Sequence, residues 1–592
     1  MNSKRFSTFE GVFTPTLLSI LGVIMYLRLG WVVGQAGLGG ALLIIVISNL
    51  ITICTGLSIA SITTNMRVGA GGAYSIISKS LGLEVGGAIG IPLYLSQALS
   101  VAFYITGFSE CWVAVFPAHS FILVSLTAWL LLLAISYTSA RLAFRLQYLI
   151  MAIIALSLVS VFLGKGHLAA AGGLSLVDIR VPFWKVFVIF FPAVTGILAG
   201  VSMSGELKNP QRSIPLGTLS AIAVAFFIYL SMAFWFKRMA APGELIANTS
   251  IIIELSRWRL PVIAGIMGAT LSSALSMFVA SSRTLLALGK HRIIPMSLSF
   301  AGVNRKGEPA VAIIFTAFLS LLAISLGNLN RIAGVLTMFF LITYGMLNIS
   351  VFIEKGLGIV SFRPRFRVHP VFSFLGSIGC FYAMFLINPF FSLISALLII
   401  IIYAVLLRRQ MKREWPDVRK GVFIFIAEQA LKISGRLPYH PKIWKPNLLV
   451  PVLNGKGIFH EVEFIKAIVA PSGRTDFFKI VPPGKPAQEL QELKESLRSR
   501  LRPLREEGVL CSSVVLEAGD FSQGAKLVMQ LKCEDCLPPN VLFVDLDQDK
   551  SFDPLLKELI YTATDYGLGN MVLRLHPDFG LGHKKKINFW VR

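Results

Sequence analysis

Apolar windows of about 20 residues recur roughly twelve times before residue 408, and each is long enough to cross a bilayer as a helix. Hydrophobic residues make up 55% of the 592 residues and charged residues only 15%, a composition far too apolar for a soluble protein. The first window lacks the small-residue cleavage site of a secretory signal and leads into further windows. The sequence therefore predicts an α-helical integral membrane protein.

Two of these windows are interrupted near their middle. Residues 11–37 read GVFTPTLLSILGVIMYLRLGWVVGQAG, with Ser19 and Gly22 inside, and residues 187–206 read FVIFFPAVTGILAGVSMSGE, with Pro192 inside. In lipid, a broken helix is tolerated only where the freed backbone groups line a cavity or meet a ligand. Two interrupted spans in corresponding positions are typical of the substrate site of an inverted-repeat transporter. The alternative is two kinked helices that pack through small residues.

The spacing of the windows indicates two halves of five spans each, followed by two more. The expected spans are 11–37, 41–62, 85–111, 121–136 and 147–163, then 187–206, 214–236, 262–289, 311–326 and 334–353. A glycine-rich segment at 65–82 precedes the third span, and a tight turn at Asn388 and Pro389 joins the last two. We expect a short amino terminus at 1–10 and a transporter domain of 12 transmembrane helices at 11–408.

Basic residues fall on alternate loops between these spans. The net charge is +24, but its placement follows the positive-inside rule and does not indicate nucleic-acid binding. The loops predicted to be cytoplasmic carry Lys4, Arg5, Arg67, Lys79, Arg141, Arg145, Lys208, Arg212, Lys290, Arg292, Arg305, Lys306 and the arginines of 363–367. Lys237, Arg238, Arg257 and Arg259 are exceptions on the opposite side. The pattern predicts a multi-pass cell-membrane protein with both termini in the cytoplasm.

Residues 409–592 change to a charged, amphipathic composition that predicts a cytoplasmic α/β domain with a mostly parallel sheet. The expected strands are 447–453, 464–470, 512–517, 540–546 and 570–576, and 486–507 has a helical pattern. GLGN and GLGH do not follow a strand and open a helix at nucleotide-binding spacing, so a nucleotide site is unsupported. Cys533 and Cys536 form one CxxC without a partner pair, which favours ordinary thiols over a metal or redox site.

The two interruptions lack a carboxylate in their core, since Glu10 and Glu206 lie at the edges. A cation held there must use carbonyl and hydroxyl oxygens, and a co-bound anion must balance its charge. Amides freed after Gly22 and around Gly196 could hold a halide or the carboxylate of an amino acid. The bulk of the three residues after Gly22, Val-Ile-Met, favours the smaller halide.

Six long stretches of the chain are similar to the cation-chloride cotransporters. They read ILGVIMYLRLGWVVGQAG, GGAYSIISKSLGLEVGGAIG, FYITGFSE, FFPAVTGILAGVSMSGELKNPQRSIPLGT, ATLSSALSMFVASSR and, in the tail, RLPYHPKIWKPNLLV. The resemblance covers essentially the whole membrane part and is to a prokaryote-like member. It implies the amino acid/polyamine/organocation fold, with a 5+5 inverted repeat and broken first and sixth helices. Compared with animal members, we expect no long amino-terminal regulatory region and a shorter carboxy-terminal domain.

The resemblance also implies the residues of the ion sites. Potassium is expected at the carbonyls of Ser19, Ile20 and Pro192 and the hydroxyls of Tyr104 and Thr195. One chloride is expected at the amides of Gly22, Val23 and Ile24, and another at those of Gly196, Ile197 and Leu198 with the Tyr344 hydroxyl. Sodium is expected at the carbonyls of Leu18, Leu21 and Ala269 and the hydroxyls of Ser272 and Ser273, and Arg28 with Glu110 at an outer gate. Ser19 and Leu21 depart from the family, which usually has Asn and a large aromatic residue there.

The resulting hypothesis is electroneutral cotransport of chloride with potassium and sodium by alternating access. It implies a transporter and not an enzyme, with no cofactor, with lipid and small inorganic ions as partners, and with a cytoplasmic domain that supports a homodimer. Three alternatives stay open: an amino-acid permease of the same superfamily, potassium-chloride cotransport without sodium, and a membrane sensor that binds without transport. The tyrosines and serines also have ordinary explanations, as satisfied bundle hydroxyls and small packing residues.

Overall fold

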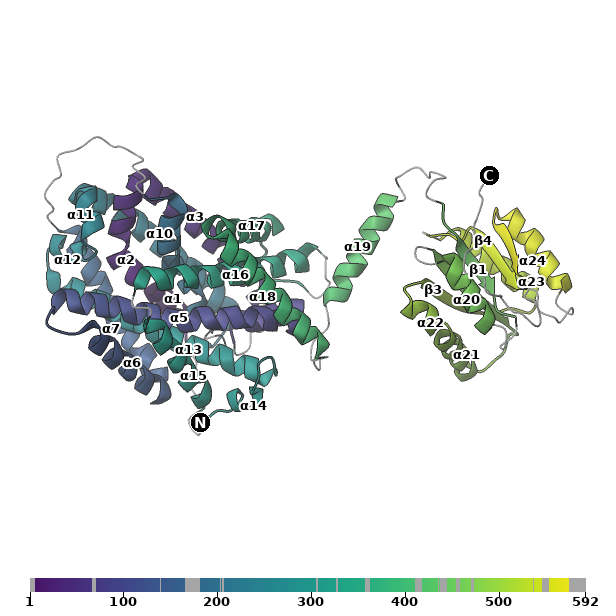
Figure 1. Cartoon of the computed structure of the whole chain (residues 1–592), viewed down its shortest axis with the longest axis horizontal. Coiled ribbons are helices and arrows are strands. Elements are labelled where there is room, and N and C mark those ends of the chain that lie inside the picture. The colour runs from purple at the N-terminus through teal and green to yellow at the C-terminus, as the bar shows by residue number, and fades with distance from the viewer. Residues whose placement is uncertain are drawn as a thin grey trace. The chain divides into compact units, whose positions relative to one another are not determined.

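The computed structural model describes most of the chain, in two compact units, Met1–Phe425 and Ile426–Arg592 (Figure 1). The described residues are 6–65, 71–138, 140–164, 181–202, 204, 207–304, 307–325, 328–356, 362–409, 418–434, 436, 444–453, 458–469, 473–535, 537–545 and 553–573. Glu206, Cys536, Lys4, Arg5, Arg67, Arg305 and Lys306 lie outside them.

The first half of the helical unit begins with a broken span. Its elements are η1 (Phe9–Phe13), α1 (Thr14–Ile20), α2 (Val23–Leu27), α3 (Leu29–Asn65), α4 (Ala73–Leu81), α5 (Leu83–Val115), α6 (Phe121–Thr138) and α7 (Ala140–Phe162). Inside α3 the backbone bends at Gly37, whose φ of 66° is a conformation that favours glycine. The end of the first span and the whole second span therefore form one kinked helix. The glycine-rich segment contributes α4, a short helix ahead of the third span.

The second half repeats the order and also begins with a broken span. Its elements are α8 (Phe183–Phe190), η2 (Phe191–Ile197), α9 (Leu198–Ser202), α10 (Pro210–Met239), α11 (Pro242–Ala247), α12 (Ile251–Leu255), α13 (Arg259–Lys290), α14 (Ser297–Phe300), α15 (Ala310–Ile324) and α16 (Leu329–Gly356), followed by α17 (Pro370–Ile387) and α18 (Pro389–Arg408). Within the described residues, nine helices are long and apolar enough to cross a membrane, and three shorter apolar helices accompany them. The predicted turn is present, since the Asn388 side chain accepts the Phe391 amide at the start of α18.

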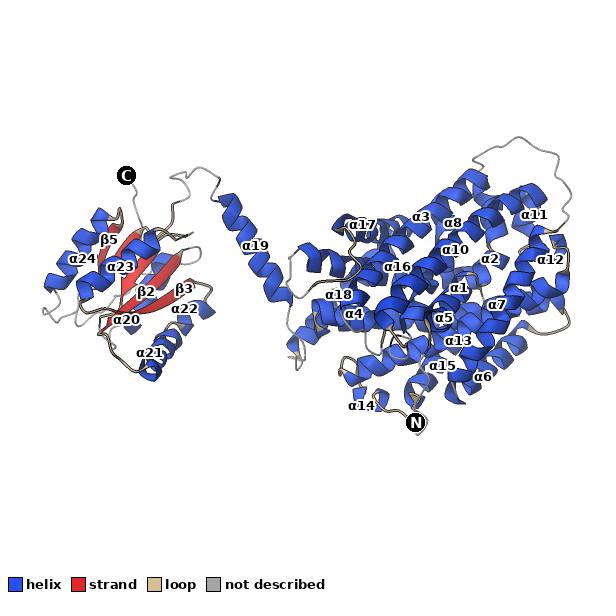
Figure 2. Ribbon diagram, turned by 180° about the vertical axis from the view of Figure 1, so that it is seen from behind, coloured by secondary structure: helices blue, strands red, loops and turns tan. Residues whose placement is uncertain are grey.

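The second unit contains a five-stranded parallel sheet in the order β3-β2-β1-β4-β5. The strands are β1 (Asn447–Pro451), β2 (Arg474–Val481), β3 (Leu510–Glu517), β4 (Val541–Asp545) and β5 (Gly569–Leu573). Helices α20 (Ile458–Val469), α21 (Ala487–Arg500) and α22 (Arg502–Glu506) cover one face, and α23 (Phe521–Cys533) and α24 (Asp553–Asp565) the other (Figure 2). A further helix, α19 (Val418–Ser434), precedes β1. The predicted parallel α/β domain is therefore confirmed.

One predicted strand is wrong. Residues 464–470 are expected to be extended, but 464–469 belong to α20, and residue 470 lies outside the described residues. Ile465, Ile468 and Val469 lie at helical spacing and pack into the core beneath the sheet. The strand that the sequence did not predict is β2. Its sequence, RTDFFKIV, carries three charges and therefore lacks a continuous apolar pattern.

Candidate functional site

The first broken helix loses its hydrogen-bond ladder between α1 and α2. Leu21 has φ −78° and ψ 36°, and Gly22 has φ −87° and ψ −146°, so neither residue continues the helix. The last carbonyls of α1 and the first amides of α2 are consequently left without their usual i→i+4 partners. Because this region is fully buried, those groups need other partners.

Hydroxyls from three other helices supply partners to three successive carbonyls of α1. Ser273 of α13 donates to the Leu18 carbonyl at 3.2 Å, and Tyr104 of α5 donates to the Ser19 carbonyl at 3.2 Å. Tyr229 of α10 donates to the Ile20 carbonyl at 2.7 Å. Leaving a buried acceptor unpaired costs about 1–3 kcal/mol, so these contacts hold the broken end in place.

Tyr229 was absent from the predicted site. Its signal in the sequence was a single tyrosine inside the apolar window 214–236, because a buried tyrosine hydroxyl usually finds a hydrogen-bond partner. What the sequence did not indicate was which carbonyl it would reach, since that depends on how α10 packs against α1.

The second broken helix runs from α8 through the 3₁₀ turn η2 into α9. Within it, the Thr195 hydroxyl donates to the Pro192 carbonyl at 2.8 Å, and Tyr344 of α16 donates to the Thr195 carbonyl at 2.7 Å. The Leu198 amide donates to the Gly196 carbonyl at the end of η2. The expected ligands of this break are thus gathered together, but several of them are bonded to one another.

The two breaks touch. A β-carbon built on Gly196 would lie 2.7 Å from the Cβ of Ser19, closer than real side chains approach. Glycine at this position therefore lets η2 lie directly against the end of α1. The carbonyls of α1 and the turn of η2 consequently line the same small region, as the paired interruptions predicted.

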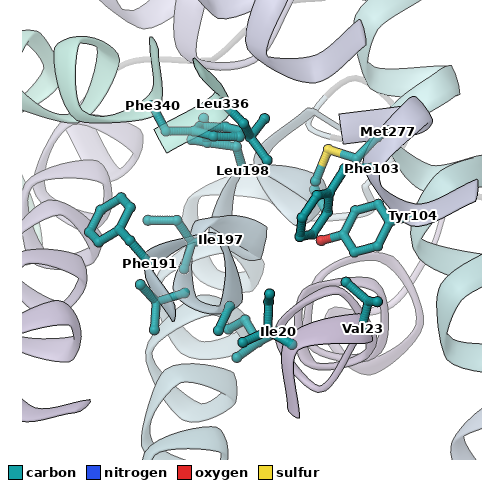
Figure 3. Close-up of a cluster of buried hydrophobic side chains, with 14 of the residues drawn as sticks. Ile20, Val23, Phe103, Tyr104, Phe191, Ile197, Leu198, Met277, Leu336 and Phe340 are labelled. Atoms are coloured by element: carbon teal, nitrogen blue, oxygen red, sulfur yellow. The ribbon is translucent and has the colours of Figure 1, made fainter. Parts of the chain in front are cut away.

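Apolar side chains enclose this region (Figure 3). They come from both broken helices and from α5, α13 and α16, and none is more than 3% exposed: Ile20, Val23, Phe103, Phe191, Ile197, Leu198, Met277, Leu336 and Phe340. Tyr104 lies among these apolar side chains and brings a hydroxyl group into the region. Because such a shell excludes water, interactions between a charge and the oxygens inside are stronger than at the surface.

Among the hydroxyls expected in the ion sites, Ser19 Oγ and Ser272 Oγ are buried without a hydrogen-bond partner among the described residues. Ser272 is adjacent to Ser273, which reaches α1, and Ala269 lies one turn earlier on the same buried face of α13. Buried polar groups normally bond to protein or to ordered water, so these two hydroxyls retain the capacity to bind a further group. Of the predicted sodium ligands, Leu18 and Ser273 are in direct contact, and Leu21 lies at the break itself.

An ion pair lies at the far end of α2. Arg28 Nη2 is 3.1 Å and 2.8 Å from the two carboxylate oxygens of Glu110, and its Nε donates to the Asn330 side chain at 2.9 Å. The side chains of Arg28 and Glu110 are 6% and 27% exposed. The two residues expected at the outer gate are therefore paired in this structure, and Asn330 of α16 is a third member that the sequence did not indicate.

The chain matches two family models in succession. Residues 11–445 match the model described as amino acid permease, and residues 450–581 match that of the first part of the prokaryotic cation-chloride cotransporter C-terminal domain. The chain belongs to the cation-chloride cotransporter family. The membership confirms the predicted resemblance and fold class, with a permease-type helical membrane part and a parallel-sheet domain after it.

Relatives within this family are found in plants and animals. The chain is 30% identical over 504 residues to "Cation-chloride cotransporter 1" of Arabidopsis thaliana, covering 75% of this chain and 51% of that protein. It is 29% identical over 657 residues to "Solute carrier family 12 member 2" of Squalus acanthias, covering 98% of this chain and 54% of that protein, and 28% identical to the Homo sapiens protein of that name, covering 98% and 53%. The chain thus spans about half the length of the curated relatives it matches.

Among solved structures, the crystal structure of the cytoplasmic domain of a prokaryotic cation chloride cotransporter is 26% identical, covers 24% of this chain and 49% of that chain, and has a TM-score of 0.21.

Proposed function

We propose that this chain cotransports chloride with potassium and sodium, without net charge movement, by alternating access between two sides of a membrane. The observation that carries the proposal is the row of buried α1 carbonyls, each facing a hydroxyl from another helix. Relatives named as cation-chloride cotransporters support the ion class.

The carbonyl and hydroxyl pairs suit cations. A hydroxyl has two lone pairs and a proton that rotates, so an oxygen that donates to a carbonyl can also turn its lone pairs toward a cation. Potassium would then bind between Tyr104 and the carbonyls of Ser19 and Ile20 on one side and Pro192 with Thr195 on the other. Sodium would bind among the carbonyls of Leu18, Leu21 and Ala269 and the hydroxyls of Ser272 and Ser273.

The anion follows from charge balance. In the described part of the two broken helices the only carboxylate is Glu10, in η1, so bound cations need a mobile counter-ion. Chloride would take the amides of Gly22, Val23 and Ile24, and a second chloride those of Gly196, Ile197 and Leu198. For the second site, Tyr344 would exchange its bond to the Thr195 carbonyl for one to the anion.

Alternating access gives the outer ion pair a role. Arg28 at the end of α2 binds both Glu110 of α5 and Asn330 of α16, and in the proposed mechanism this contact would close the outer path. We further propose a homodimer in a cell membrane, with both termini and the α/β domain in the cytoplasm. No cofactor and no nucleic acid enter this scheme.

An amino-acid permease is the second candidate, because the first family model carries that description. The residues after Gly22 favour the halide: Val23 and Met25 are 0% exposed and Ile24 2%, and their bulk suits a small anion better than a carboxylate with an α-amino group.

Uptake into proteoliposomes separates the candidates. Labelled rubidium, as a potassium substitute, and labelled chloride should each accumulate in a manner that requires the other ion, whereas labelled amino acids should not accumulate. Amino-acid uptake without ion uptake would establish the permease, and ion binding without any flux would establish a sensor.

A further inference from the structure

A cleft of about 590 Å³ lies at the loop side that the positive-inside pattern predicts to be cytoplasmic. It is formed by the first turns of α10, the end of α3 and the loop before α17. Arg212 and Arg365 line it together with Leu216, Leu219 and Phe366. The ion site described above uses none of these residues.

The two arginines bring positive charge to one cleft. Both are exposed, and among the described residues neither guanidinium has a hydrogen bond or an ion pair, and no carboxylate lines the cleft. The loop that carries Arg365 is nevertheless fixed, because the Phe366 amide donates to Thr64 Oγ1 at 3.2 Å and the Arg363 amide to Asn65 Oδ1 at 2.7 Å. The backbone that carries Arg365 is therefore in place before any anion arrives.

The same cleft has an apolar wall at greater depth. Leu216 and Leu219 lie four and seven residues after Arg212, which places them about 6 Å and 10 Å further along α10. They share one face with Arg212, and Leu216 is 54% exposed. The cleft thus has a basic mouth at the helix end and an apolar side that continues toward the bilayer interior.

We propose that this cleft binds one anionic phospholipid of the cytoplasmic leaflet. Its phosphate would lie between Arg212 and Arg365, because guanidinium groups bind phosphate oxygens with two parallel hydrogen bonds. Its upper methylene groups would lie on Leu216 and Leu219. A free phosphate would satisfy the arginines but leave the leucine wall uncovered, and a zwitterionic lipid would bring its own positive charge to the mouth.

The test uses the full chain in detergent micelles, with lipid binding measured by native mass spectrometry. The probes are phosphatidylglycerol, phosphatidylcholine with the same acyl chains, and glycerol 3-phosphate. The variant is Arg212→Gln with Arg365→Gln. The matched control is Arg257→Gln with Arg259→Gln, which removes two exposed arginines from the side predicted to be opposite.

For the parent chain and the control we expect one phosphatidylglycerol to bind more tightly than phosphatidylcholine or glycerol 3-phosphate. The variant should bind this first phosphatidylglycerol about 25-fold more weakly, from roughly five-fold per arginine. If the variant does not fold, Arg212→Lys with Arg365→Lys keeps the charges and should still bind phosphatidylglycerol more weakly than the parent. Equal binding of the two lipids, equal binding by parent and variant, or glycerol 3-phosphate binding as tightly as the lipid would overturn the proposal.

Discussion

Buried hydroxyls near the two breaks have one role in the structure and a second in the proposed function. In this structure Ser273, Tyr104 and Tyr344 each donate to a backbone carbonyl, and this keeps broken helices stable in an apolar surrounding. The resemblance assigns these same three hydroxyls to the ion sites, together with those of Thr195 and Ser272. Ion binding would therefore exchange protein hydrogen bonds for ion contacts, and substitutions that remove a hydroxyl should separate the two roles.

The first prediction concerns Tyr344→Phe. Removing a hydroxyl that donates to a bound anion should raise the half-saturating chloride concentration for rubidium uptake at least ten-fold, since hydrogen bonds to charged groups contribute about 1.5–3 kcal/mol. The control is Tyr94→Phe, whose hydroxyl pairs with Thr316, 3.3 Å away. An unchanged chloride dependence in Tyr344→Phe, with the protein folded, would remove Tyr344 from the anion site.

The second prediction concerns sodium. Ser272→Ala with Ser273→Ala removes both hydroxyls from the face of α13 toward α1, so sodium should no longer stimulate rubidium uptake. The matched control is Ser281→Ala with Ser282→Ala, on the same helix, where each hydroxyl bonds to a carbonyl of its own helix at 3.0 Å. Full rubidium uptake by the parent chain with sodium replaced by an organic cation would instead identify potassium-chloride cotransport.

At the scale of elements, the sequence predicted that two helices are broken, because glycine, serine and proline stand where a span requires apolar helix formers. It also predicted the parallel sheet from short apolar runs that alternate with helical patterns. Packing partners could not be predicted, since Tyr229 and Asn330 lie more than 200 residues from the groups they contact. Likewise, the apolar run of α20 fits either a strand or a buried helix, and only its place beneath the sheet decides.

The third prediction tests how α10 supports the end of α1. Tyr229→Phe leaves the Ile20 carbonyl without its donor and should lower stability by about 1–3 kcal/mol in ion-free buffer. Rubidium should recover part of this loss, because a bound cation can face the freed carbonyl.

Thermal unfolding with and without rubidium chloride checks the effect. The control is Tyr26→Phe, which removes a buried hydroxyl that pairs with Ser157, 3.0 Å away, and not with a carbonyl. If rubidium stabilises both variants equally, the Ile20 carbonyl does not face the cation.

The fourth prediction concerns the pair that joins α2 to α5. Arg28→Glu and Glu110→Arg should each reduce rubidium uptake, because each places like charges close together at the site of the present bond. The double reversal should recover more uptake than the single losses predict, with a coupling of about 0.5–3 kcal/mol. Asn330 should help the double variant to recover uptake. Its side-chain oxygen accepts a hydrogen bond from Arg28 in the parent chain, and its amide nitrogen can donate one to a carboxylate at position 28. Losses that simply add would show that the two charges act independently.

At the scale of the whole molecule, the chain has two properties. Its membrane unit encloses oxygens and amides, with no central carboxylate among the described residues, and the same chain continues into a parallel α/β unit. In the proposed function the first property favours coupling, because a co-bound anion offsets the charge of a cation inside an apolar shell. We therefore expect little cation leak in the absence of chloride.

The most direct test of this coupling is rubidium accumulation driven only by chloride. Proteoliposomes would hold equal rubidium and sodium on both sides, with an inward chloride gradient set against an impermeant anion and with the membrane potential clamped at zero. Coupled, electroneutral transport predicts that labelled rubidium accumulates above its external concentration and returns to it as the chloride gradient decays. Rubidium that only equilibrates, at a rate independent of chloride, would contradict the account.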